Sequence, residues 1–131
     1  MTRPEERTRP HKSKAGLVRI RHALLYSFAG LTSAFRNESA FRQELALATV
    51  LVLIAVALPA TLVQIALLIN SVLLVLVAEL LNSAIEATVD RISFDDHALA
   101  KQAKDIGSAA VFVSLVGCAV IWGLVLFDIF G

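Results

Sequence analysis

The chain has 131 residues, of which 57% are apolar, and it carries a formal net charge of +1. Soluble domains are usually about half apolar, so this composition and a mean hydropathy of +0.75 exclude an ordinary soluble domain. The length allows one compact unit.

The basic residues are unevenly distributed. All twelve Lys and Arg lie either in the first 42 residues or in residues 91–104, and neither the turn at Pro59 nor the sequence after Asp105 contains one. Cytoplasmic loops of membrane proteins are enriched in Lys and Arg. We therefore expect the N-terminus and residues 91–104 to face the cytoplasm, and the Pro59 turn and the C-terminus to lie on the other side.

Two different segments precede the apolar part of the chain. Residues 1–14 are polar and charged, which predicts a disordered cytoplasmic tail. In residues 15–36 large apolar side chains recur every three or four positions, which indicates a helix with one apolar stripe. The stripe consists of Leu17, Ile20, Leu24, Phe28, Leu31 and Phe35. We expect this amphipathic helix to lie in the plane of the lipid headgroups.

Three apolar segments follow, at about 41–58, 62–90 and 105–130, and Pro59 ends the first of them. At about 1.5 Å per residue each is long enough to cross roughly 30 Å of hydrocarbon. The last turns of the second segment are expected to extend into the cytoplasm. The sequence thus predicts an all-α integral membrane protein in which residues 15–131 form one domain.

Polar side chains interrupt the second apolar segment on one face. They are Glu79, Asn82, Glu86 and Asp90, and at about 100° per residue they fall within an arc of roughly 80°. Burying one acid in lipid costs about 2.5–3.5 kcal/mol on insertion scales. The row therefore predicts a reaction centre or a pathway. The simpler alternatives are a buried ion pair or proton-binding site for Glu79, and a solvated helix end for Glu86 and Asp90.

Further polar groups would meet this row at the cytoplasmic boundary. They are Asn37, Glu38, Arg42 and Glu44 before or within the first span, Asp95, Asp96 and His97 in the loop, and Lys104, Asp105 and Ser108 at the third span. Acids that converge with a lysine suit a Mg²⁺–phosphate site, because Mg²⁺ takes one or two carboxylates together with phosphate oxygens and water. The sequence contains neither of the glycine-rich motifs of soluble nucleotide-binding folds.

The depth of each residue predicts its role. Glu79 would lie roughly 10 Å deeper than Glu86 along the helix axis, so a layered site is expected. Glu79 would meet the hydroxyl of a lipid headgroup, while Glu86 and Glu38 would hold a metal on a nucleotide and Lys104 would neutralise phosphate charge. Alternatively, Glu38 and Arg42 form a surface salt bridge, and Lys104 is an ordinary lysine at a helix end.

Three runs of residues strongly resemble the bacterial integral-membrane diacylglycerol kinase family. They are Asn37-Glu38-Ser39-Ala40-Phe41-Arg42-Gln43-Glu44, Glu79-Leu80-Leu81-Asn82-Ser83-Ala84-Ile85-Glu86-Ala87-Thr88-Val89-Asp90-Arg91 and Ala103-Lys104-Asp105-Ile106-Gly107-Ser108-Ala109-Ala110. The likeness extends from about Gly16 to Gly131. It implies a homotrimer of three-span protomers in the bacterial inner membrane, each with an N-terminal surface helix. It also implies transfer of the γ-phosphate of ATP, with Mg²⁺, to diacylglycerol to give phosphatidic acid, with no nucleic acid partner.

The resemblance also implies a role for individual residues. Glu79 matches the proposed general base of the family, and Glu38 and Glu86 match its metal- and nucleotide-binding acids. The remaining positions that match nucleotide contacts are Arg19, Tyr26, Asn82, Asp95, His97, Lys104 and Asp105. At the lipid substrate the expected contacts are Glu79, Ser108 and Glu44, with Asp90 in a supporting position.

Other functions stay open at this point. A related branch phosphorylates undecaprenol, although Arg42-Gln43-Glu44 is more similar to the diacylglycerol branch. From the residues alone, a small transporter with Glu79 as a proton-coupled site is an alternative, and so is a structural membrane subunit. A transporter does not need the cluster around Lys104 and Asp105, and a structural subunit leaves the acidic row unexplained.

Overall fold

A computed structural model describes residues 12–92 and 97–131 of the chain. These residues form four helices, α1 (Lys12–Asn37), α2 (Ser39–Ala57), α3 (Leu62–Ile92) and α4 (Ala98–Phe130), and no strand occurs among them. α2, α3 and α4 are each long and apolar enough to cross a membrane. The predicted all-α membrane fold, with three long apolar helices after an N-terminal helix, is confirmed. The predicted tail falls mainly on residues 1–11, which lie outside the described residues.

The chain divides into two compact units, Met1–Ser33 and Ala34–Gly131. Residues 12–33 of α1 form the described part of the first unit, where all side chains from Ala15 onward are exposed, and the last four residues of α1 belong to the second unit. The hydroxyls of Ser27 and Thr32 donate to carbonyls one turn back, at 2.7 and 2.8 Å. These two hydroxyls are satisfied within the helix, whereas the apolar stripe is exposed along its whole length. Its location in the headgroup plane stays a prediction.

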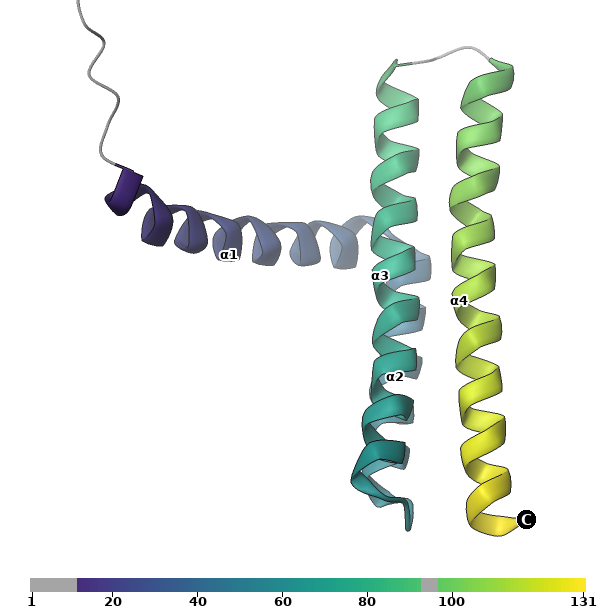
Figure 1. Ribbon diagram of the computed structural model, residues 1–131. Helices are drawn as coiled ribbons and strands as arrows, with labels where there is room; N and C mark the ends of the chain where they lie inside the picture. The colour runs from purple at the N-terminus through teal and green to yellow at the C-terminus, as the bar shows by residue number, and fades with distance from the viewer. Residues whose placement is uncertain (1–11, 93–96) are drawn as a thin grey trace, which may run out of the picture. The chain divides into compact units, whose positions relative to one another are not determined.

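In the second unit α3 packs against both α2 and α4 (Figure 1). The C-terminus lies at the same end as the α2–α3 turn. Ala55, Leu68 and Val125, one from each helix, form the buried cluster. Nearby, Gln64 Nε2 donates a hydrogen bond to Asp128 Oδ2 at 2.6 Å and so joins α3 to α4. This end of the unit is therefore held by both packing and a polar contact.

The start of α3 is fixed by a reciprocal pair of hydrogen bonds. The backbone N–H of Thr61 donates to Gln64 Oε1 at 3.0 Å, and the N–H of Gln64 donates to Thr61 Oγ1 at 3.2 Å. This is the capping box, in which two otherwise unsatisfied N–H groups at a helix start find acceptors. Together with Pro59 just after α2, it keeps the connection between the helices short.

The start of α4 differs from the expected one. We expected the third span to begin near residue 105 after a loop over residues 91–104, but the helix begins at Ala98. His97 caps it, since His97 Nδ1 accepts a hydrogen bond from the N–H of Leu99 at 3.2 Å. The residues that follow are mostly Ala, Leu, Lys and Gln, which favour helix although they are not all apolar. The hydropathy pattern therefore predicted a helix about two turns shorter than the one observed.

Candidate active site

The polar row on α3 changes steadily in exposure along the helix. Glu79 and Asn82 are each 8% exposed, Glu86 is half-buried and Asp90 is exposed. All four follow the helical spacing that brings positions three and four apart onto one face. The first acid of the row is thus buried, while the last is exposed near the end of the helix.

The N-terminal end of α2 brings a second set of acids to this row. Glu38 is the residue that precedes α2, and its side chain makes no capping hydrogen bond to the helix. Its expected alternative partner, Arg42, instead donates from Nη1 to the carbonyls of Phe35 and Arg36 at 2.8 and 3.1 Å. Arg42 therefore secures the turn between α1 and α2, and the carboxylate of Glu38 is not committed to a surface salt bridge with it.

Four carboxylates from α2 and α3 interact electrostatically. The charges of Glu86 and Glu38 both act on Glu79, and Glu79 acts on Glu44. The start of α2 therefore lies beside the middle of α3. One oxygen of Glu44, Oε2, is buried and has no hydrogen-bond partner within residues 12–92 and 97–131. Like charges at close range repel each other, so this group of acids favours binding of a cation.

The fit of Mg²⁺ can be tested against these residues. Within residues 12–92 and 97–131 there is no group of three or more His, Cys, Asp or Glu arranged to hold a metal ion. Mg²⁺ usually takes only one or two carboxylates and completes its shell with phosphate oxygens and water. Glu38 and Glu86 suit that incomplete set, and a metal held there would need a phosphate ligand.

Glu44 also borders a small open pocket of about 60 Å³. The lining is otherwise apolar apart from Cys118, and it is contributed by α2, α3 and α4. Ser71, which is buried in α3, donates to the carbonyl of Leu68 at 2.7 Å and lies 3.5 Å from Cys118 Sγ. The pocket therefore brings the side chain of Glu44 together with apolar groups of all three long helices.

Asn82 connects the row to α4. Its Nδ2 donates a long hydrogen bond to Glu86 Oε1 at 3.5 Å, and its buried Oδ1 has no hydrogen-bond partner among the described residues. The same oxygen occupies the position that a side chain at Gly107 would need. Gly107 thus lets α4 approach Asn82 closely. This role was not predicted from the sequence, although a glycine inside an otherwise apolar helix is the signal for it.

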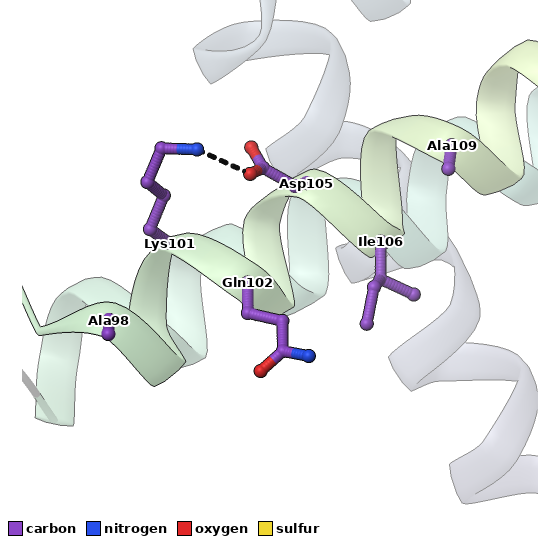
Figure 2. Close-up of a pocket in the computed structure, with 6 residues that line it drawn as sticks. All are labelled: Ala98, Lys101, Gln102, Asp105, Ile106 and Ala109. Atoms are coloured by element: carbon purple, nitrogen blue, oxygen red, sulfur yellow. Dashed lines mark hydrogen bonds and ion pairs between the residues drawn. The ribbon is translucent and has the colours of Figure 1, made fainter.

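Two lysines on α4 both have acidic partners. Lys104 Nζ lies 2.5 Å from Asp90 Oδ1 and so links α4 to the end of α3. Lys101 Nζ lies 2.6 Å from Asp105 Oδ2, one helical turn away on the same helix (Figure 2). The supporting role expected of Asp90 stays a prediction. Lys101 was not singled out in the sequence analysis.

The remaining predicted site residues are more dispersed. Ser108 is exposed on α4, and His97 is exposed and caps that helix. Arg19 and Tyr26 are exposed on α1 in the first unit, where the Tyr26 ring lies 6.1 Å from that of His22. Asp95 lies outside the described residues. The structure therefore brings together the acids of α2 and α3, and it links Asp90 with Lys104.

The chain is similar to known proteins over most of its length. Residues 25–126 match the family model described as prokaryotic diacylglycerol kinase. The diacylglycerol kinase of Pseudomonas aeruginosa is 51% identical over 117 residues, which cover 89% of this chain and 95% of the relative. The corresponding enzyme of Haemophilus influenzae is 48% identical, covering 86% and 95%. That of Escherichia coli K12 is 46% identical, covering 88% and 95%.

Proposed function

Since the chain belongs to the prokaryotic diacylglycerol kinase family, we propose that it transfers the γ-phosphate of ATP to the free hydroxyl of diacylglycerol and gives phosphatidic acid and ADP. The observation that carries the proposal is the burial of Glu79 in α3, within the electrostatic reach of Glu38 and Glu86. In this proposal the buried carboxylate of Glu79 meets the hydroxyl of the lipid headgroup, while the more exposed Glu86 faces the water-soluble nucleotide.

Glu79 acts as the general base in this proposal. It takes the proton of the diacylglycerol hydroxyl as the hydroxyl oxygen forms a bond to the γ-phosphorus. The bond between that phosphorus and the β–γ bridging oxygen breaks, and ADP leaves with the electron pair. A positioned base contributes about 10²–10⁴-fold to such a step. The rest of the catalysis is positioning and charge stabilisation, which a set of fixed polar side chains can supply.

The nucleotide side of the site uses the other members of the cluster. Glu38 and Glu86 would hold Mg²⁺, which would offset the charge that develops on the phosphate oxygens. Asn82, packed against Gly107, orients Glu86 through its amide. Lys104 neutralises phosphate charge, and its ion pair with Asp90 fixes its position at the ends of α3 and α4. Nucleotide contacts by Arg19, Tyr26, Asp95, His97 and Asp105 belong to the same proposal.

The lipid side and the assembly also belong to the proposal. Ser108 and Glu44 would contact the lipid together with Glu79. We expect a homotrimer in the bacterial inner membrane, with the N-terminus in the cytoplasm and the C-terminus outside. In support, large apolar side chains such as Leu47, Leu74 and Val113 are exposed on the three long helices. Lipid or neighbouring copies would cover them.

Transfer of radiolabelled γ-phosphate in mixed micelles tests the function. Purified protein with Mg-ATP is given diacylglycerol, undecaprenol or no lipid, and Glu79→Gln serves as the control. The expected result is labelled phosphatidic acid that is lost in the variant. Label on undecaprenol alone would retain the mechanism and overturn the substrate. The absence of any lipid-dependent label from folded protein would overturn the kinase proposal.

A further inference from the structure

An exposed face of α4 carries a charged pair beside the proposed nucleotide site. Lys101 Nζ lies 2.6 Å from Asp105 Oδ2, and the two side chains are 80% and 63% exposed. They border a surface hollow of about 330 Å³ on this helix (Figure 2). The other lining residues are Ala98, Gln102, Ile106 and Ala109. Lys101 therefore lies in contact with a residue that the proposed function gives to ATP, although no role has been given to Lys101 itself.

The charges near Asp105 indicate a role for its contact with Lys101. Lys104, the other lysine near the start of α4, already pairs with Asp90. ATP brings further negative charge, so an acid without a nearby cation would repel it. Mg²⁺ at Glu38 and Glu86 would offset part of this repulsion, but it would not act directly at Asp105. Lys101 does contact Asp105 and supplies a positive charge there.

We propose that Lys101 is a positioning residue of the nucleotide site, which neutralises Asp105 and holds its carboxylate so that the site accepts an anionic nucleotide. The proposal rests on the proposed function. Lys101 acts through Asp105 and does not touch the reacting atoms. Its removal should weaken ATP binding, while the chemical step and the binding of lipid are unchanged.

The competing explanation is a helix-surface ion pair. Acids and bases four residues apart on a helix commonly pair and add slightly to helix stability. Such a pair would leave the KM for ATP unchanged. The KM for Mg-ATP, compared with kcat and with the KM for diacylglycerol, therefore separates the two explanations, and thermal stability alone does not.

The test uses full-length protein in mixed micelles and compares Lys101→Gln, Lys101→Arg and wild type. Arg21→Gln, on α1, is the matched control that removes one exposed positive charge elsewhere. In Lys101→Gln we expect the KM for Mg-ATP to rise about two- to fivefold, the range that exposed ion pairs support, and the rise to shrink at high salt. Lys101→Arg should restore the wild-type value. An unchanged KM for Mg-ATP in Lys101→Gln, or an equal rise in Arg21→Gln, would overturn the proposal.

A second measurement tests whether Lys101 acts through Asp105. Binding of a fluorescent ATP analogue is measured for Lys101→Gln, Asp105→Asn and the double variant. If Lys101 acts by neutralising Asp105, its removal should have no further effect once Asp105 is uncharged. A full effect of Lys101→Gln in the Asp105→Asn background would overturn the positioning role. Failure of wild-type protein to label any lipid would instead refute the underlying kinase function, which keeps the two failures distinct.

Discussion

Asn82 and Gly107 meet across the contact between α3 and α4, where Oδ1 of the amide fills the position of the missing side chain. The amide is 8% exposed, and its nitrogen reaches Glu86. The backbone of α4 therefore forms the wall that keeps Asn82 directed toward the acids of the proposed site. A glycine at 107 is required for that arrangement, because any Cβ would displace the amide.

Gly107→Ala should consequently damage both stability and activity. The added methyl group collides with Asn82, and overpacking of this kind costs about 1–3 kcal/mol. Displacement of the amide also removes the orientation of Glu86, so kcat should fall as well. Unfolding in detergent micelles and phosphate transfer to diacylglycerol measure the two effects.

Gly117→Ala on the same helix is the matched control. Nothing in the described chain lies within 4 Å of a Cβ at that position, so stability and kcat should stay close to wild type. If the two alanine variants had the same stability and the same kcat, the close approach at Gly107 would contribute to neither.

Removing the contact between Gln64 and Asp128 should lower stability and, unlike the change at Gly107, leave kcat unchanged. The two residues are joined at 2.6 Å at the end of the unit where the α2–α3 turn lies. Gln64 precedes Glu79 by fifteen residues on α3, or about 22 Å along the helix. Asp128→Ala should lower the free energy of unfolding by about 0.5–1.5 kcal/mol and leave kcat unchanged. Asp128→Asn keeps an acceptor oxygen and should recover most of the loss; a kcat that fell without destabilisation would contradict this separation.

The ion pair between Asp90 and Lys104 should matter little for stability. The two side chains are 64% and 41% exposed, and exposed pairs contribute about 0–1 kcal/mol. Asp90→Asn should therefore change the free energy of unfolding by less than about 1 kcal/mol, with the difference vanishing at high salt. Lys104→Met should raise the KM for ATP more than Asp90→Asn does, since only Lys104 is proposed to meet phosphate. A larger rise in Asp90→Asn would reverse these roles.

The three long helices and the polar row on α3 could be predicted from the sequence because both depend on local spacing. The apolar segments predict three long helices, and the spacing of Glu79, Asn82, Glu86 and Asp90 predicts one face. The steady change in their exposure follows from their order along α3. Such features need only the helical period and the cost of burying an acid.

Contacts between helices could not be predicted in the same way. The meeting of Asn82 with Gly107 depends on how far α4 is shifted along α3, which the spacing within either helix leaves undetermined. The early start of α4 was missed because residues such as Lys101 and Gln102 favour helix without being apolar. The contact of Lys101 with Asp105 was missed for the same reason. The sequence placed Lys101 in a loop and Asp105 at the start of the third span, whereas both lie on α4.

The proposed metal site makes a prediction about Mg²⁺ concentration. Glu38→Gln and Glu86→Gln each remove one carboxylate from a set of two, so the Mg²⁺ concentration for half-maximal activity should rise by about tenfold or more. Titration of phosphate transfer with Mg²⁺ at fixed ATP measures the change. Asp128→Asn removes one acid at the far end of the unit and should leave the titration unaltered. An unchanged titration in either glutamate variant would remove that residue from the metal site.

Glu79→Gln should separate function from folding. The substitution keeps the shape of the side chain but removes a charge that is buried beside two other acids. Because burial of that charge is costly, the variant should be at least as stable as the wild type. Loss of a general base should nevertheless lower kcat by about 10²–10⁴-fold, with binding of an ATP analogue nearly unchanged. Equal loss of nucleotide binding would move Glu79 into the nucleotide site, and lower stability together with lower activity would make it a structural residue. A stable variant that binds nucleotide and transfers no phosphate is the result expected if the acid is buried for the chemical step.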